Sequence, residues 1–249
     1  MHRFHIPPAH CKGPRLILAE GEAHHATRVL RVAEEEVVEV LDGVGNRFTC
    51  RVTSARKTRV EMEVLSKESV PPPPFQVTLL AGIPKGQLLD GIVEQATELG
   101  VRRIVPLMTE RGNVRFDPAA GRAKQSKWQV TALEAIKQCG SLWVPEVAAP
   151  THFHHALDSI PATELSLVAS LHAGAVEVGA ALSGGGTPAR VSIWIGPEGD
   201  FTPGELERLI ARGARPITLG SHVLRCPTAA IASVAIVAHE LRSRMTPAA

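Results

Sequence analysis

The chain has 249 residues, of which 44% are hydrophobic, and its formal net charge is +2. This length allows one large domain or two small ones with an apolar core. The near-neutral charge means that any polyanion must be bound through local basic patches. No run of 18 apolar residues occurs, so we expect no transmembrane helix, and the first ten residues lack the apolar centre of a signal peptide.

The aromatic residues and the cysteines narrow the possible classes of protein further. Tyrosine is absent and aromatic residues make up 4% of the chain, which argues against an aromatic platform for single-stranded nucleic acid. The four cysteines are widely scattered without metal-type spacing, which favours free thiols in a reducing cytoplasm. They are Cys11, Cys50, Cys139 and Cys226.

Residues 1–70 are expected to form a small, mostly β unit. Residues 59–65 alternate well, with Val60, Met62 and Val64 on one face and Glu61 and Glu63 on the other. Short strands separated by turn signals favour a small barrel. The other expected elements are strands at 15–19, 37–41 and 47–52 and a short helix at 22–30.

Pro71–Pro74 is the clearest boundary in the chain. Four consecutive prolines favour polyproline II, a semi-rigid spacer of roughly 12 Å at about 3.1 Å per residue. We therefore predict a linker at 71–74 between the β unit and a second domain at 75–249.

After residue 75 the pattern alternates between strand and helix, which predicts an α/β domain with a parallel sheet. Helix 87–99 carries Leu88, Leu89, Ile92, Val93, Ala96 and Leu99 at helical spacing and is closed by Gly100. Strands are expected at 76–83, 103–107, 165–170, 191–195 and 216–219. Further helices are expected at 125–137, 175–182, 203–212 and 228–242, with a glycine hinge at 184–186.

The stretch 191–236 contains two strand–loop–helix units in tandem. The first strand stops at Gly196–Asp200, a sharp turn with two glycines and a proline. Thr202 as N-cap, Pro203 and Glu205 form a capping-box start, and Phe201 and Leu206 have staple spacing. The second irregular loop is 220–227. This layout predicts a ligand at the carboxyl ends of the strands.

Two common phosphate motifs do not fit the loop at 196–200. A P-loop needs a following Gly-Lys-Ser/Thr, and a dinucleotide fingerprint needs three spaced glycines in the first strand–helix turn. Taken alone, the pentapeptide is better explained as a plain strand-to-helix turn than as a ligand site.

Basic residues cluster between 102 and 127, with seven against two acidic ones, a local charge of +5. A solvated helix face is the ordinary explanation of such a run, but the density slightly favours a phosphate-binding face. The basic residues are Arg102, Arg103, Arg111, Arg115, Arg122, Lys124 and Lys127.

Histidines occur close together at 24–25 and at 152–155. No nearby cysteine or carboxylate completes a known metal spacing, so we expect structural or surface histidines and no metal.

Several motifs carry a family resemblance. Segments 195–205 (IGPEGDFTPGE) and 219–230 (LGSHVLRCPTAA) resemble the two C-terminal motifs of bacterial 16S rRNA uridine-N3 methyltransferases, a family of the knotted SPOUT class. The resemblance extends over nearly the whole chain, through 24–31 (HHATRVLR), Lys85-Gly86, 94–101 (EQATELGV), Glu110-Arg111, Trp128 and Gln138-Cys139-Gly140.

The chain departs from the family pattern at four positions. His222 stands where the family has Arg, Pro227 where it has Glu before Thr-Ala, and Ser141 where Arg is common. Asp200 replaces the last glycine of the family's GPEGG. The motif at 219–230 therefore matches the family pattern only in part, whereas the motif at 195–205 matches it apart from Asp200.

The resemblance implies a PUA-like β-barrel at 1–70 and a methyltransferase domain at 75–249 with a C-terminal trefoil knot. It implies S-adenosylmethionine as cofactor, bent and held by the backbone of three loops, 171–174, 195–199 and 219–229. The cofactor residues implied by position are Leu171, His172, Gly174, Ile195, Gly196, Gly199, Leu219, Gly220, Leu224, Cys226 and Ala229.

Arg225 is the expected catalytic side chain. The N3 of uridine is protonated and weakly acidic, so a fixed guanidinium near the uracil oxygens would stabilise the developing anion. A salt bridge to a neighbouring acid is the alternative role. Glu198 either orients the cofactor or caps a helix, and His222 is expected to be a surface or packing histidine. The expected RNA contacts are His24, Arg28, Arg31, Lys85, Arg111 and Arg115, with Arg28 and Arg31 on one side of the short helix.

The resemblance implies a cytoplasmic homodimer acting on 16S rRNA or the small ribosomal subunit, with helix 229–238 as a candidate interface. Two alternatives stay open. One is a sister SPOUT enzyme that methylates another RNA atom, such as a ribose 2′-hydroxyl. The other is a non-catalytic RNA-binding assembly factor that has lost cofactor binding.

Overall fold

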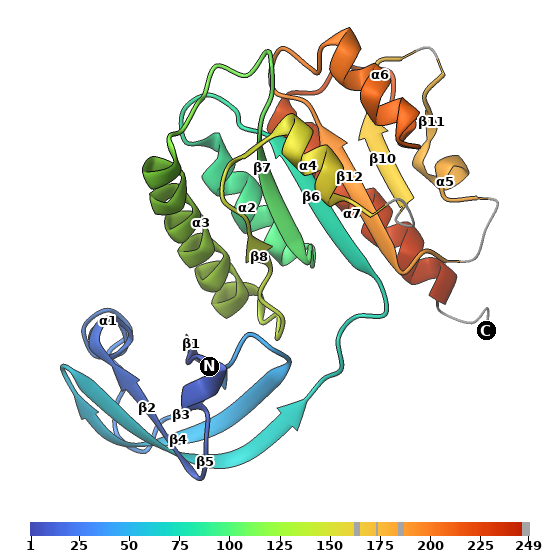
Figure 1. The fold of residues 1–249 in the computed structure, drawn as a ribbon. Helices are drawn as coiled ribbons and strands as arrows, with labels where there is room; N and C mark the ends of the chain where they lie inside the picture. Colours follow the sequence, from blue (N-terminus) through green and yellow to red (C-terminus); the bar gives the residue numbers. More distant parts are fainter. Residues whose placement is uncertain (162–164, 173, 184–186, 246–249) are drawn as a thin grey trace. The chain divides into compact units, whose positions relative to one another are not determined.

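The computed structural model describes residues 1–161, 165–172, 174–183 and 187–245 (Figure 1). The chain divides into two compact units, one formed by 1–72 with 133–144 and the other by the rest of the chain. The expected glycine hinge at 184–186 lies outside the described residues. Across the described ranges, no helix combines the length and apolar character that crossing a bilayer requires.

The first unit is built on a curled five-stranded sheet in the order β1–β3–β4–β5–β2. β1 pairs with β3 in parallel, and the other neighbours are antiparallel. The β4–β5 pair has two register shifts, which bend such a pair. The elements are β1 (Arg3–His5), η1 (Pro8–His10), β2 (Arg15–Ala19), β3 (Val37–Leu41), β4 (Asn46–Arg56) and β5 (Arg59–Ser69).

The inner face of this sheet is apolar because side chains on a strand alternate between its faces. Val60 and Met62 are buried, whereas Glu63 is exposed, as the alternation in 59–65 predicts. Val60 and Met62 belong to a hydrophobic core cluster. The cluster also contains buried residues of the other four strands, among them Phe4, Leu16 and Leu18. The small β unit expected from the sequence is therefore confirmed.

The short helix near residue 22 differs from the expectation. It consists of α1 (Glu20–His24) followed by a π-helical turn, η2 (His25–Val29), in which Leu30 N donates to His25 O at 3.1 Å. Arg31 lies beyond the helix with φ +56°. The prediction that Arg28 and Arg31 share one helix side is wrong, because α-helical spacing does not extend through the wider turn.

The end of α3 (Pro118–Cys139) and the loop after it belong to the first unit. Arg3 Nη1 donates to Gln138 O at 2.8 Å, and Lys137 Nζ pairs with Glu22 Oε1 at 2.8 Å. Burial opposes the charge of Lys137, but hydrogen bonds to Glu134 and Glu22 outweigh it and raise the pKa of this amine. The expected linker at 71–74 stays a prediction.

The described residues of the second unit form an eight-stranded sheet in which every pairing is parallel. The order is β11–β13–β10–β12–β6–β7–β8, with β9 also beside β7. The strands are β6 (Gln76–Gly82), β7 (Arg103–Met108), β8 (Glu146–Val147), β9 (Thr151–His152), β10 (Leu165–Ala169), β11 (Val176–Glu177), β12 (Arg190–Ile195) and β13 (Arg215–Thr218).

Helices cover both faces of this sheet (Figure 1). α4 (Phe153–Ser159) and α6 (Pro203–Ala211) pack through Phe153 and Leu209 against Leu80 and Trp194. α2 (Leu88–Glu98) and α7 (Cys226–Met245) contact each other, and α7 also contacts β6 and β12. Because both faces are covered, residues 191–195 are all buried. The predicted parallel α/β domain is confirmed, and the trefoil knot stays a prediction.

Two local expectations fail in this unit. The helical spacing predicts Leu88 on the apolar face of its helix, but this residue is 53% exposed and lies at the first position of α2. The weak helix at 175–182 starts instead as β11, since Val176 and Glu177 pair with the edge of β13, and only α5 (Val178–Ala181) is helical. All four cysteines are free, as expected.

A partly buried hydrogen-bond cluster joins α2 to α3. Asp90 accepts hydrogen bonds from Trp128 Nε1 at 2.8 Å and from Lys127 Nζ. Burial opposes the charge of Asp90, but the bonds from Lys127 and Trp128 prevail and lower its pKa below the ordinary value.

Asp90→Asn is therefore expected to lower the free energy of unfolding at pH 7 by about 1–3 kcal/mol. A carboxylate whose pKa is lowered in the folded state stabilises the fold above its unfolded-state pKa of about 3.9. This stabilisation is lost as the pH falls through the folded-state pKa. The deficit of the variant should thus shrink below about pH 4, as measured by urea unfolding across pH. Asp158→Asn, at an exposed pair with Arg212, is the control, with a change of at most about 1 kcal/mol. A deficit unchanged at pH 3 would contradict the assignment to the Asp90 charge.

Candidate functional site

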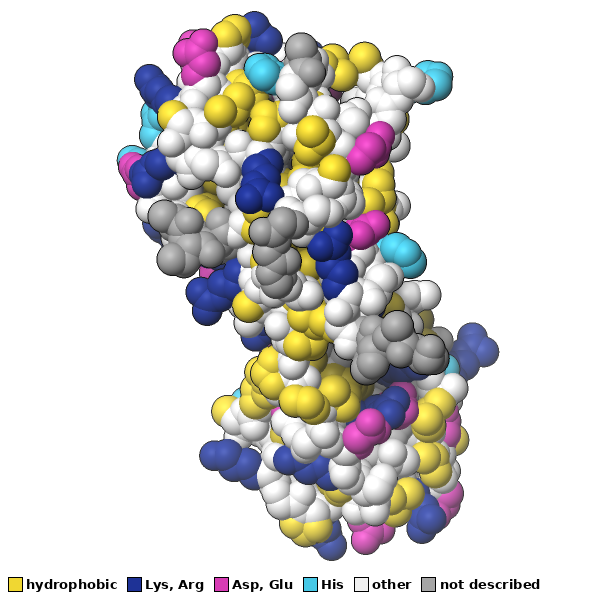
Figure 2. Space-filling view, turned by 90° about the vertical axis from the view of Figure 1, so that its right-hand side faces the viewer, with side chains coloured by type: hydrophobic (Ala, Val, Ile, Leu, Met, Phe, Trp, Pro, Cys, Tyr) yellow, Lys and Arg dark blue, Asp and Glu magenta, His cyan; other side chains and the backbone are white. Residues whose placement is uncertain are grey.

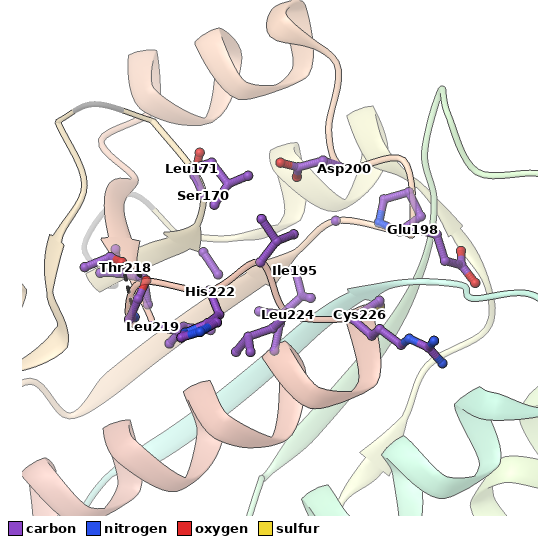
Figure 3. Close-up of a pocket in the computed structure, with 18 of the residues that line it drawn as sticks. Ser170, Leu171, Ile195, Glu198, Asp200, Thr218, Leu219, His222, Leu224 and Cys226 are labelled. Carbon is purple, nitrogen blue, oxygen red and sulfur yellow. Dashed lines mark hydrogen bonds between the residues drawn. The ribbon is translucent and has the colours of Figure 1, made fainter.

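Three loops meet above the carboxyl ends of β13, β10 and β12, which are neighbours in the sheet in that order. Parallel strands present their carboxyl ends at one edge, so the loops that follow them converge. They enclose a cavity of about 440 Å³, lined from 169–171, 195–200 and 217–229 (Figure 3). This volume is typical of a small-molecule site, about 300–1,000 Å³. The structure thus makes Gly196–Gly199 and Leu219–Ala229 neighbouring walls of one cavity.

The loop after β12 is a tight turn, in which Asp200 N donates to Pro197 O at 2.9 Å. Gly82, at the end of the adjacent β6, allows this loop to approach, since a Cβ there would lie 2.5 Å from Pro197 N. Asp200 has φ +57°, a left-handed conformation that glycine favours and Asp or Asn tolerates. Its Oδ1 accepts a hydrogen bond from Phe201 N at 2.7 Å.

The start of α6 anchors the far end of this turn. Thr202 and Glu205 form the predicted capping box with Pro203 at the first helical position, which is confirmed. Phe201 and Leu206 belong to one apolar cluster. The helix therefore begins where the sequence indicates and gives the turn a rigid base.

The loop after β7 is tied to the same turn. Arg111 Nη1 donates to Gly199 O at 3.0 Å, and Glu110 N donates to Glu205 Oε1 at 2.9 Å. Arg115 donates to the carbonyl oxygens of its own loop, including those of residues 109 and 112. Both arginines were predicted to contact RNA, and the structure places them as ties within the loops at the cavity edge. Their contact with RNA stays a proposal.

Arg225 and Glu198 both line the cavity. The Arg225 guanidinium is exposed, and within the described residues no hydrogen bond or ion pair engages it. Glu198 Oε1 accepts a hydrogen bond from Lys85 N at 2.8 Å, so its carboxylate ties the loop after β12 to the loop after β6. Arg225 is thus available to a ligand, whereas Glu198 has a bond to the backbone.

The final helix starts earlier than expected. α7 begins at Cys226 rather than residue 228, because Ala229 N donates to Arg225 O at 2.9 Å and Pro227 fits in a first helical turn. Cys226 is buried and donates its thiol to Gly82 O at 3.5 Å. Burial raises the pKa of this thiol to about 12, so it stays protonated and is no nucleophile at neutral pH.

Most residues expected to hold a cofactor line the cavity. His172 and Gly174 do not, although they follow Leu171 directly, because Gly174 N donates to His172 Nδ1 at 3.0 Å and both residues are exposed. The expected residues that line the cavity are Leu171, Ile195, Gly196, Gly199, Leu219, Gly220, Leu224, Cys226 and Ala229.

Sequence reasoning missed several lining residues. Ser170 is expected inside a strand, but β10 ends one residue earlier, at Ala169, and Ser170 lies on the cavity wall. Thr218 also lines the cavity, as the last residue of β13. His222, expected at the surface or in packing, is exposed and also lines the cavity. Asp200 is a fourth lining residue that was missed. Its presence where the family motif has glycine was the signal that could have found it.

Of the remaining expected RNA contacts, His24 and Arg28 lie on α1 and η2 of the first unit, with Arg31 just beyond, and Lys85 lies after β6 in the second. On the face drawn in Figure 2, the Lys and Arg side chains of the described residues are dispersed among apolar and polar ones. Across the described ranges, no group of three His, Cys, Asp or Glu side chains has the arrangement of a metal site.

Comparison with known proteins identifies the class. A family profile for an RNA methyltransferase domain matches residues 71–238, and one for an RNA methyltransferase PUA domain matches residues 18–65. The curled N-terminal sheet and the parallel sheet with its loop-lined cavity are thus those of an RNA methyltransferase with a PUA domain.

Several relatives align over almost the whole chain. Ribosomal RNA small subunit methyltransferase E of Synechocystis sp. is 31% identical, covering 94% of this chain and 77% of its own. The protein of the same name from Aquifex aeolicus is 30% identical, and the alignment covers 95% of this chain and 99% of that protein. The crystal structure of the Neisseria gonorrhoeae protein of this name, bound to S-adenosyl methionine, has a TM-score of 0.85 at 30% identity, covering 95% and 96%. The chain belongs to the ribosomal RNA small subunit methyltransferase E family.

Proposed function

We propose that this protein transfers the methyl group of S-adenosylmethionine to N3 of a uridine in small-subunit ribosomal RNA. Family membership supports the methyl donor and the RNA class. The observation that carries the proposal is the cavity at the ends of β13, β10 and β12, which has the exposed Arg225 guanidinium in its wall. The choice of uridine N3 rests on the motif resemblance and on the chemistry that an arginine can perform.

The residues of the cavity fit this donor. Its volume of about 440 Å³ suits a ligand of nucleoside size with an amino-acid tail. Leu171, Leu219 and Leu224 offer apolar surface to a flat base. Gly196 and Gly220 line the cavity without a side chain, and Gly220 has φ +115°, which other residues rarely adopt. We therefore propose that the loops bind the donor mainly through apolar contacts and the backbone.

The bound donor supplies a methyl carbon activated by a positive sulfur. The chain must hold the uracil in line with that carbon and exclude water from it. The N3 proton passes to solvent, which leaves negative charge on the uracil oxygens. N3 then bonds to the methyl carbon as the bond from that carbon to sulfur breaks, and S-adenosylhomocysteine leaves. The Arg225 guanidinium, a positive charge with a planar fork of donors, stabilises that negative charge.

We further propose that the chain acts as a homodimer on 16S rRNA or the small ribosomal subunit. Val223 and Leu171 line the cavity and are 78% and 70% exposed, which is unusual for apolar side chains at a site that must exclude water. A second copy, docked along residues 229–238 of α7, would cover such surface. Val234 and Val237 of this stretch are buried in the chain's own core, and Ile236, 38% exposed, is the exposed apolar side chain that it offers to a partner. His24, Arg28, Arg31, Lys85, Arg111 and Arg115 are the proposed RNA contacts.

Loss of the gene is expected to remove 3-methyluridine from 16S rRNA, measured by mass spectrometry of nuclease-digested rRNA. Complementation with the wild-type chain should restore it. Intact 3-methyluridine with loss of a 2′-O-methylated nucleotide would replace the uridine-N3 assignment. Calorimetry with S-adenosylmethionine tests the cofactor separately, and no binding near millimolar ligand would indicate a non-catalytic assembly factor.

A further inference from the structure

Among the described residues that line the cavity, two carry carboxylates, Glu198 and Asp200, and they are placed differently. Glu198 Oε1 accepts the Lys85 N–H, and its side chain points away from the cavity centre (Figure 3). The Asp200 carboxylate instead points across the cavity toward Ser170 and Leu171 on the facing wall (Figure 3). Asp200 thus presents negative charge to whatever fills the space between the loops.

The turn itself does not require this carboxylate. At φ +57°, glycine is the residue that meets least steric resistance, and the family motif has glycine there. Asp200 Oδ1 is used by the following Phe201 N–H. Within the described residues, no side chain donates to Oδ2, and neither His222 nor Arg225, the cationic or titratable bases of the lining, pairs with Asp200.

The methyl donor carries two positive groups, its sulfonium and its α-ammonium. A carboxylate in a half-enclosed cavity attracts such a group more strongly than it would in open water. We propose that Asp200 is a cofactor-binding residue of this chain that holds a cationic group of the donor. This inference rests on the proposed function, and it adds a charged side chain to a site otherwise built from backbone and apolar surface.

Asp200→Asn is the variant that tests the role of the carboxylate charge. Asparagine tolerates the left-handed backbone and keeps an amide oxygen for the Phe201 N–H, so the charge alone is removed. Binding would be measured by calorimetry with S-adenosylmethionine, S-adenosylhomocysteine and neutral 5′-methylthioadenosine. We expect the variant to bind S-adenosylmethionine about three- to tenfold more weakly, with less dependence on salt, and methylthioadenosine unchanged.

The second ligand distinguishes the two positive groups. S-adenosylhomocysteine lacks the sulfonium charge, so unchanged binding of it assigns Asp200 to the sulfonium. An equal loss with S-adenosylhomocysteine assigns it to the ammonium. Glu207→Gln, an exposed site on α6 outside the cavity, removes the same charge and should leave all three affinities unchanged.

Two results overturn the inference. One is equal affinity of wild type and Asp200→Asn for S-adenosylmethionine, and the other is an equal loss for methylthioadenosine, which indicates a distorted loop. Both leave the proposed function intact, because the wild type still binds the donor. A wild-type protein that binds no S-adenosylmethionine would reject the proposed function itself, and the role of Asp200 with it.

Discussion

Arg225→Ala is expected to lower kcat by about 10²–10³-fold while the Kd for S-adenosylmethionine changes by no more than about threefold. The guanidinium is proposed to act on charge that develops on the uracil in the transition state, so its loss lowers the rate far more than it weakens donor binding. Its exposure and lack of a polar partner among the described residues mean that removal breaks no hydrogen bond or ion pair of the fold. The rate would be measured by single-turnover methyl transfer to small subunits, and Kd by calorimetry.

Two matched variants sharpen this test. Arg225→Lys keeps the charge but loses the planar fork of donors, so it should recover only part of the rate. Arg190→Ala removes an exposed arginine at the amino end of β12, the end of that strand remote from the cavity loop, and should leave kcat unchanged. A kcat for Arg225→Ala within threefold of wild type would exclude Arg225 from the chemistry.

Gly82→Ala is expected to weaken S-adenosylmethionine binding by at least about tenfold and to lower the free energy of unfolding by about 1–3 kcal/mol. The added Cβ would lie 2.5 Å from Pro197 N and 3.0 Å from Gly196 C. These are backbone atoms, so no flexible side chain can move away, and the loop after β12 must shift. Gly82 O also accepts the Cys226 thiol, so two walls of the cavity meet this residue. Calorimetry gives Kd, and thermal unfolding should show a decrease of about 2–4 °C per kcal/mol.

Gly91→Ala is the control for this substitution. Gly91 lies inside α2, its added Cβ meets nothing within 4 Å, and alanine favours a helix by up to about 1 kcal/mol over glycine. The control should therefore be slightly more stable and bind the donor normally. If Gly82→Ala matches Gly91→Ala in both measurements, the close approach of β6 to the loop is not what shapes the cavity.

The local elements were predictable wherever a few adjacent residues set the conformation. Thr202, Pro203 and Glu205 start α6 as expected, because a cap is satisfied within one turn of helix. The buried run 191–195 indicated a strand covered on both faces. The predictions failed where packing by other segments decided the conformation. Val176 and Glu177 were expected in a helix, but they pair with β13 and form a strand of the sheet.

The candidate site was predictable in part. The two C-terminal loops carry their own glycine and proline signals, so sequence reasoning located them. Ser170 was missed because strand ends depend on pairing with neighbours, and an error of one residue places a cavity residue inside a strand. Thr218 was missed because it lines the cavity as the last residue of β13 itself, which no loop signal in the sequence marks. Asp200 stood out in the sequence only as a departure from a motif, and only the tertiary structure shows that its side chain points toward the cavity (Figure 3).

The amino-acid sequence by itself determined the two kinds of unit, the strands and caps, and the glycine loops that end β12 and β13, because these depend on residues close in the chain. Only the tertiary structure decided that β10 lies between β12 and β13, although those two strands are consecutive along the chain. It also decided that residues 133–144 belong with the first unit. The physical reason is that strand order minimises the exposed apolar area of segments far apart in sequence, and no short window of residues contains that information.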